Sequence, residues 1–201
     1  MPRLLVATKN AHKTAEIRDI LGDGWEITDL TAHPEVPIPE ERGATFEENA
    51  RIKAEAASRV FSELVLSDDS GLEVDALGGA PGVQSARYTG AHGDDASNRA
   101  RLKRELAACG KPGPWVARFR CVMALAEAGR TVATFDGQVE GRILEQELGT
   151  GGFGYDPLFV PDGFQETFGQ LPAEAKNSFS HRARALLALR VFLETKLPQL
   201  R

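Results

Sequence analysis

The sequence predicts one α/β unit on a mixed β-sheet, with helices flanking the sheet and two lobes around a central cleft. Helical and strand-like patterns alternate along the 201 residues, as expected for helices packed on a sheet. A period-two apolar pattern over residues 115–125, then Ala128-Gly129 and a second strand pattern, predicts a central hairpin. The chain has no internal repeat and no long linker, so we expect a single domain over residues 1–201.

The first part of the chain is expected to form strands and helices in alternation. Strands are predicted over residues 4–7, 25–30 and 64–67. Helices are predicted from the spacing of Ile17, Ile20 and Leu21, ending at Gly22 and Gly24, and from Thr45 to about Phe61. Thr45 and Glu48 match the capping box S/T-x-x-E, so Thr45 is the expected N-cap and Glu48 needs no catalytic role.

The second part is expected to carry the hairpin, short strands and two further helices. Strands are predicted over residues 115–125, 131–135, 143–144 and 158–160. Helices are predicted from Asp95 or Ser97 to Leu106, and from Ser180 to Leu197 with Pro198 as the stop.

Composition excludes several classes of protein. The net charge of −5 argues against a protein that coats nucleic acid. No apolar run approaches the ~18 residues of a membrane span, and the N-terminal residues lead directly into a strand pattern rather than a signal peptide. Cys109 and Cys121 have no metal-binding spacing. We therefore expect reduced thiols and a cytoplasmic protein that binds neither nucleic acid nor membrane.

A pair of carboxylates suggests a cation site. Asp68 and Asp69 lie in the segment Ser67-Asp68-Asp69-Ser70-Gly71, at the expected mouth of the strand over residues 64–67. Mg²⁺ usually binds one or two carboxylates together with substrate phosphates and water. The alternative is a solvated Asp-Ser-Gly turn, and these residues alone leave both interpretations open.

Two other segments could supply charge to the same site. Thr8-Lys9-Asn10-Ala11-His12-Lys13 lies between a strand and a helix, where backbone N–H groups and the helix dipole favour an anion. It differs from a Walker A loop, and the alternative is a capped helix with a surface lysine. Glu41 precedes the helix that carries Lys53; it is free to point into a cleft, or it is simply solvated in its loop.

A glycine-rich loop could bind a planar base. Gly149, Gly151 and Gly154 formally match GxGxxG, but a dinucleotide fingerprint must open a helix, whereas a strand-like run follows here. Phe153 and Tyr155 could stack on a base and Asp156 could accept its N–H groups, the alternative being a tight loop with packed aromatic rings. Further donors follow at Lys176, His181 and Arg182.

Taken in order, these segments resemble the inosine-triphosphate pyrophosphatase family. The resemblance spans nearly the whole chain and rests on Thr8-x-Asn10-x-x-Lys13, Thr45-Phe46-x-Glu48-Asn49-Ala50, Ser67-Asp68-Asp69-Ser70-Gly71-Leu72, Gly78-Gly79-Ala80-Pro81-Gly82, Ser85-Ala86-Arg87-Tyr88, Gly149-Thr150-Gly151-Gly152-Phe153-Gly154-Tyr155-Asp156-Pro157 and Ser180-His181-Arg182. Lys9 stands where bacterial members often have Gly.

The resemblance implies an elongated α/β fold, a homodimer and Mg²⁺-dependent hydrolysis of ITP, dITP and XTP to monophosphate and pyrophosphate. It implies that Glu41 and Asp69 hold Mg²⁺, with Asp68 as a neighbouring candidate and Asp69 also the base. The implied phosphate and sugar contacts are Thr8, Asn10, Lys13, Lys53 and Ser70. Lys9, Ala11 and His12 complete the implied substrate-binding segment. The implied surroundings of the base are Phe153, Gly154, Tyr155, Asp156, Lys176, His181 and Arg182.

Hypoxanthine and xanthine present O6 as an acceptor beside an N1–H donor, and adenine reverses both. A site in which His181 or Arg182 donates to O6 and another group accepts from N1–H would reject adenine, because its buried polar groups would be left unmatched. Three other functions stay open: a pyrophosphatase for modified pyrimidine or methylated nucleotides, a non-catalytic nucleotide sensor, and a dinucleotide oxidoreductase. Hydrolysis of ITP compared with dUTP, pyrophosphate release with Mg²⁺ compared with EDTA, and NAD(P)H binding would separate them.

Overall fold

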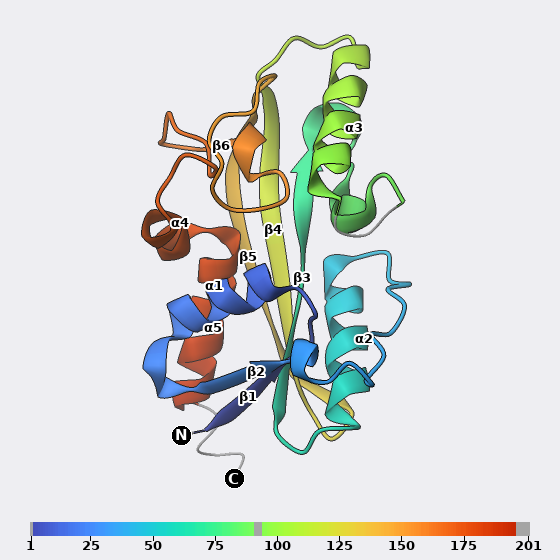
Figure 1. Ribbon diagram of the computed structural model, residues 1–201, viewed down its shortest axis with the longest axis vertical. Helices are drawn as coiled ribbons and strands as arrows, with labels where there is room; N and C mark the ends of the chain where they lie inside the picture. Colours follow the sequence, from blue (N-terminus) through green and yellow to red (C-terminus); the bar gives the residue numbers. More distant parts are fainter. Residues whose placement is uncertain (1, 91–93, 196–201) are drawn as a thin grey trace. The chain divides into compact units, whose positions relative to one another are not determined.

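The computed structural model describes residues 2–90 and 94–195, and it confirms an α/β fold on a mixed sheet (Figure 1). Within the described residues, one six-stranded sheet has the order β2-β1-β3-β4-β5-β6. Strand β1 pairs in parallel with β2 and β3, whereas β5 and β6 are antiparallel. The strands are β1 Arg3–Val6, β2 Glu26–Asp29, β3 Leu64–Val74, β4 Trp115–Glu127, β5 Arg130–Ile143 and β6 Phe159–Pro161. The helices are α1 Ala11–Leu21, α2 Phe46–Ser58, α3 Asp95–Ala108, α4 Ala173–Phe179 and α5 His181–Thr195.

The chain divides into two compact units. Unit 1 is formed from Met1–Asp69, Cys121–Gly137 and His181–Arg201, and unit 2 from Ser70–Arg120 and Gln138–Ser180. The dividing points fall inside β3, β4 and β5, so each of these strands contributes residues to both units. Each unit has its own apolar core. A single domain over residues 1–201 stays a prediction.

In unit 1, helices pack on both faces of the parallel strands. On one face Leu4 of β1 packs in a cluster with Ile17 of α1 and Leu186 of α5. On the other face Leu5 packs in a cluster with Ala57 of α2. Because successive side chains of a strand point to opposite faces, a strand buried on both sides has a continuous apolar run, as residues 4–7 do.

Strand β3 is longer than the sequence pattern predicted. The expected strand ended at residue 67, with the two aspartates at its mouth, but β3 continues to Val74 and both aspartates lie inside it. It continues because Leu72 and Val74 belong to the core of unit 2. Gly71 permits close packing there, since a Cβ at this position would lie 2.4 Å from Oγ of Ser85. The prediction of a strand mouth at Asp68 and Asp69 was therefore wrong.

Other boundaries differ in smaller ways. The capping box at Thr45 and Glu48 is confirmed. Helix α3 is capped by Asp94, whose side chain accepts from the backbone N of Ser97, rather than by Asp95 or Ser97. The strand expected over residues 131–135 lies inside β5, and the strand expected over residues 143–144 overlaps β5 only at its last residue, Ile143. Helix α4 was not predicted. The predicted helix end at Leu197 and Pro198 lies outside the described residues.

Candidate functional site

The start of α1 is fixed by its own side chains. Oδ1 of Asn10, the N-cap, accepts from the backbone N of His12 at 3.0 Å and of Lys13 at 3.3 Å. Oγ1 of Thr8 accepts from the backbone N of Asn10 at 3.1 Å. Lys9 is exposed, and its Nζ donates to the carbonyl oxygen of Pro34 at 3.3 Å. The segment is therefore a well-formed helix cap, and its contacts with phosphate stay a prediction.

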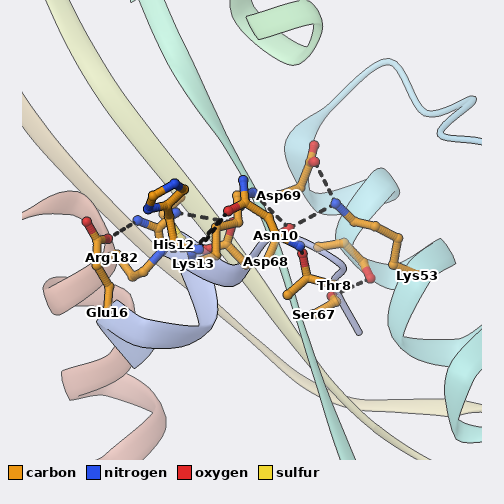
Figure 2. Close-up of polar contacts among 12 residues, drawn as sticks. Thr8, Asn10, His12, Lys13, Glu16, Lys53, Ser67, Asp68, Asp69 and Arg182 are labelled. Atoms are coloured by element: carbon orange, nitrogen blue, oxygen red, sulfur yellow. Dashed lines mark hydrogen bonds and ion pairs between the residues drawn. The ribbon is translucent and has the colours of Figure 1, made fainter. Parts of the chain in front are cut away.

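Asp68 and Asp69 have different surroundings because they are neighbours in a strand. Adjacent strand residues point to opposite faces of a sheet. Asp68 follows the parity of Leu66 and lies on the face packed by α1 and α5, whereas Asp69 follows the parity of Ser67, whose Oγ donates to the carbonyl oxygen of Ala50 in α2. Figure 2 shows the two carboxylates reaching separate groups of side chains.

Asp68 is the centre of a buried charge cluster. Its Oδ1 accepts from Nζ of Lys13 at 2.5 Å, and its Oδ2 accepts from Nε of Arg182 at 2.9 Å (Figure 2). The thiol of Cys121 also donates to Oδ2, with Sγ 3.2 Å away. Burial alone would raise the pKa of Asp68, but the charges of Arg182 and Lys13 outweigh it and hold that pKa well below its ordinary value. Asp68 is therefore ionised, and its two oxygens already form ion pairs with Lys13 and Arg182.

Arg182 is fully buried at the start of α5, with an exposed fraction of 0%. Besides Asp68, its guanidinium donates to the carboxylate of Glu16 in α1. These carboxylates outweigh the desolvation of Arg182 and raise its pKa well above the ordinary value. The described contacts thus place Arg182 in an ion-pair network that joins α1, β3 and α5, and its contact with a base stays a prediction. Its neighbour His181 is also buried.

On the other face, Lys53 of α2 joins two carboxylates. Its Nζ lies 2.8 Å from Oε1 of Glu41 and 2.8 Å from Oδ1 of Asp69, and it donates to the carbonyl oxygen of Asp68 at 2.9 Å. Burial alone would lower the pKa of Lys53, but the two carboxylates outweigh it and raise that pKa. Burial raises the pKa of Asp69, and Lys53 offsets only part of this effect. Asp69 therefore has the environment of a carboxylate that can accept a proton.

The donor set around Asp69 fits a hard cation. Among residues 2–90 and 94–195, no group of three or more His, Cys, Asp or Glu side chains is arranged to hold a metal ion. Mg²⁺ does not need such a group, because it binds through one or two carboxylates and takes its other ligands from phosphate and water. Oδ2 of Asp69 is buried and has no hydrogen-bond partner within the described part of the chain. Such an oxygen, near Glu41, suits a metal ligand.

Unit 2 contains a second cluster of predicted site residues. Nζ of Lys176 lies 2.6 Å from Oδ2 of Asp156 and 4.9 Å from the centre of the Phe153 ring. The same Oδ2 accepts from the backbone N of Phe153 at 2.9 Å. Gly152 has a φ of +69°, and a Cβ there would lie 2.0 Å from this oxygen, so the loop can close on Asp156 only with glycine. A ring face, an ammonium and a carboxylate are thereby held together.

The remaining predicted residues are less closely tied to these clusters. Tyr155 belongs to the core of unit 2, and its hydroxyl donates to the carbonyl oxygen of Ser85 at 2.9 Å. Gly154 donates its N–H to Asp95 and accepts from Arg99. Ser70 is half-buried in β3, and Ala11 and His12 are exposed at the start of α1. Their contacts with a nucleotide stay predictions.

Sequence reasoning missed two members of the Asp68 cluster. Glu16 lies three residues after Lys13, which places both on one face of α1, so helical spacing could have paired them. Cys121 lies in the strand predicted over residues 115–125 and belongs to the core of unit 1, but no pattern indicated that its thiol donates to Asp68.

Known proteins resemble this chain over nearly its full length. A family model described as the Ham1 family matches residues 4–192. The chain belongs to the Ham1 family. The dITP/XTP pyrophosphatase of Listeria monocytogenes is 45% identical to this Ham1 chain over 190 residues, covering 94% of it and 93% of the relative. The dITP/XTP pyrophosphatase of Geobacter sulfurreducens is 48% identical over 195 residues, covering 94% and 96%.

A solved structure supports the same assignment. The structure of a HAM1 protein from Coxiella burnetii matches this Ham1 chain with a TM-score of 0.85 and 38% sequence identity, covering 96% of this chain and 99% of that one. These matches confirm the family that the motifs indicated and the fold class that the sequence predicted.

Proposed function

We propose that this Ham1-family chain hydrolyses the non-canonical purine nucleoside triphosphates ITP, dITP and XTP to the monophosphate and pyrophosphate. The observation that carries the proposal is the cluster of Glu41, Lys53 and Asp69, in which one buried ammonium joins two carboxylates and a buried carboxylate oxygen lacks a hydrogen-bond partner within the described residues. Relatives that match nearly the whole chain are named dITP/XTP pyrophosphatases, which supports the choice of substrate.

The proposed cofactor is Mg²⁺, held by Glu41 and Asp69. When bound, it neutralises phosphate charge and orients the attacking water. Asp68 is a weaker candidate for a metal ligand, because Lys13 and Arg182 already bind its two oxygens.

The chain's own residues would then bind the triphosphate and move one proton. Lys13 and Lys53 supply ammonium groups that stabilise negative charge as the α–β bond breaks and pyrophosphate leaves. The attacking water adds its oxygen to phosphorus and loses a proton to Asp69. The raised pKa of Asp69 favours this transfer, because a stronger base holds the proton more tightly.

The cluster in unit 2 is the proposed contact for the base. Phe153 offers a ring face, Lys176 a donor for O6 and Asp156 an acceptor for N1–H. Hypoxanthine and xanthine present that acceptor and donor, whereas adenine reverses both, so adenine would leave buried charges unmatched. Tyr155 would support the loop through its hydrogen bond to Ser85 rather than stack on the base.

Pyrophosphate release from a panel of nucleotides tests the proposal. Purified protein with Mg²⁺ is expected to release pyrophosphate from ITP, dITP and XTP well above the rates for ATP, GTP, dUTP and methylated NTPs. Excess EDTA is expected to abolish release. A preference for dUTP or for methylated NTPs would show that the protein is a pyrophosphatase for other nucleotides. Binding of ITP without turnover would indicate a non-catalytic nucleotide sensor.

Lys13→Ala is expected to weaken the binding of a nucleoside triphosphate far more than that of a monophosphate. Lys13 lies in the first turn of α1, and its ammonium is held beside β3 by Asp68, where it can meet the β and γ phosphates. Inhibition constants for IMP and for a non-hydrolysable ITP analogue measure the difference. Arg51→Ala is a suitable control, because Arg51 is a surface cation of α2 paired with Glu47. Equal losses for both ligands would place Lys13 away from those phosphates.

The assembly and location of the protein are also proposals. Among the described residues no helix has the length and apolar character needed to cross a membrane. Both cysteines are free thiols, which supports the cytoplasm as the proposed compartment. A homodimer is proposed from the family resemblance, and light scattering with size-exclusion chromatography would measure it.

A further inference from the structure

Asn49, in the first turn of α2, has no role in the chemistry described above, yet its side chain is completely buried, with an exposed fraction of 0%. Its Oδ1 accepts from the backbone N of Gly43 at 2.8 Å. Gly43 lies two residues after Glu41, the proposed metal ligand. Asn49 therefore fixes the backbone of the loop that carries this carboxylate.

Asn49 and Lys53 act on that loop together. They lie four residues apart in α2 and so share one face of the helix. Asn49 holds the backbone of the loop at Gly43, and Lys53 holds the side chain of Glu41 at 2.8 Å. Two contacts from one rigid helix thus define both the path of the loop and the place of its carboxylate.

The loop approaches α2 so closely that Gly43 has no room for a side chain. A Cβ at this position would lie 2.6 Å from Cβ of Glu48 and 2.7 Å from Oδ1 of Asn49. Real Cβ atoms do not approach other atoms this closely, so any larger residue would push the loop away from the helix. The hydrogen bond to Asn49 depends on this close approach.

Asn49 is a costly residue to bury for packing alone. Its Nδ2 is buried and has no hydrogen-bond partner within the described residues. A buried, unsatisfied donor loses its hydration without compensation, so an apolar side chain of similar size would fill the space at lower cost. The amide is better explained by the bond that its oxygen makes to the Glu41 loop.

We propose that Asn49 is a positioning residue that sets Glu41 for metal binding. The inference rests on the proposed function, because that function makes Glu41 a metal ligand. Residues that orient metal ligands typically change metal affinity by about 10- to 100-fold. Asn49 does this through the backbone of Gly43 rather than by touching the metal.

Mn²⁺ binding without nucleotide tests the inference directly, because the free Mn²⁺ signal in electron paramagnetic resonance requires no turnover. Asn49→Ala is expected to weaken Mn²⁺ binding about tenfold. Gly43→Ala, which disturbs the same contact from the other side, is expected to do the same. In the background of Glu41→Gln, Asn49→Ala is expected to cause no further loss of Mn²⁺ affinity, because the effects of two residues that act through one another are not additive.

Asn98→Ala is the matched control. Asn98 is also a buried helix residue, exposed by 1%, and its Oδ1 accepts from the backbone N of Thr89 at 2.9 Å. It belongs to unit 2, so this variant is expected to lower the melting temperature without changing Mn²⁺ affinity.

Three results would overturn the assignment, and a fourth would overturn its premise. A positioning role would be excluded if Asn49→Ala left the Mn²⁺ affinity unchanged. It would also be excluded if Asn49→Ala lowered the Mn²⁺ affinity as much in the Glu41→Gln background as in the wild type, or if Asn98→Ala lowered it as much as Asn49→Ala does. If Asn49→Ala does not fold, the same comparisons with Gly43→Ala decide. Glu41→Gln that binds Mn²⁺ as tightly as the wild type would instead remove Glu41 from the proposed metal site, and the inference with it.

Discussion

Asp69→Asn is expected to lower kcat for ITP at least a hundredfold, equivalent to about 2.7 kcal/mol of activation free energy. Asparagine keeps the shape and an oxygen for Lys53, but it removes the charge for Mg²⁺ and the site for the proton. The fold is expected to survive, because burial already raises the pKa of Asp69 and so disfavours its charged form. Pyrophosphate release at saturating ITP measures kcat, and circular dichroism checks the fold.

Asp23→Asn is the control for this prediction. Asp23 is an exposed aspartate in unit 1, so the same chemical change there is expected to leave kcat unchanged. If Asp69→Asn retained more than about a tenth of the wild-type kcat, a loss below ~1.4 kcal/mol, Asp69 would be neither the base nor an essential metal ligand.

Arg182→Ala is expected to lower the free energy of unfolding by about 3–5 kcal/mol, the usual result of removing one partner from a buried ion pair. The guanidinium is fully buried and binds both Asp68 and Glu16, so its loss leaves two carboxylates with less compensation. Urea denaturation at neutral pH measures the change, with the slope of the transition checked against the wild type.

Arg190→Ala is the matched control on the same helix. Arg190 pairs with Glu194 on the surface, both more than half exposed, so its removal is expected to cost no more than about 0.5 kcal/mol. The same variants also address base choice. Unchanged stability together with a selective loss of ITP hydrolysis over ATP would assign Arg182 to the base instead of the ion-pair network.

The elements of the fold follow from local patterns, but the extent of the strands does not. The alternation over residues 115–125 and the capping box at Thr45 are local features, and both predicted the structure correctly. The prediction for strand β3 ended too early, at residue 67, because the polar run from Ser67 to Ser70 looks like a turn when its spatial neighbours are unknown. Those polar residues are buried in a strand only because α2, Lys13 and Arg182 supply partners from distant parts of the chain.

Most charged residues of the two clusters were named as candidates from the sequence, but Glu16 was missed and none of the pairings was predicted. Residue type alone did not distinguish Asp68 from Asp69, and only the family resemblance favoured Asp69 as the base. In the structure, strand parity places Asp68 beside Arg182 and Asp69 beside Lys53. The family resemblance implies a base contact for Arg182, which stays a prediction, but the sequence did not reveal that Arg182 also pairs with Asp68. Such contacts between residues more than a hundred positions apart depend on tertiary packing, which local propensity does not encode.

The interleaving of the two units has a consequence for synthesis on the ribosome. When translation reaches Ser180, all segments of unit 2 have been made, but unit 1 still lacks α5. Helix α5 supplies Leu186 and Leu189 to the core of unit 1 and Arg182 to the ion pair with Asp68. A nascent chain therefore carries an incomplete core of unit 1, with Asp68 missing a principal counter-charge, until α5 has been translated. Domains usually fold in order of synthesis. Here residues 1–69 are made before unit 2, but the core that they belong to is completed by α5, which is made after it. Until then the apolar residues of that core expose surface that chaperones can bind.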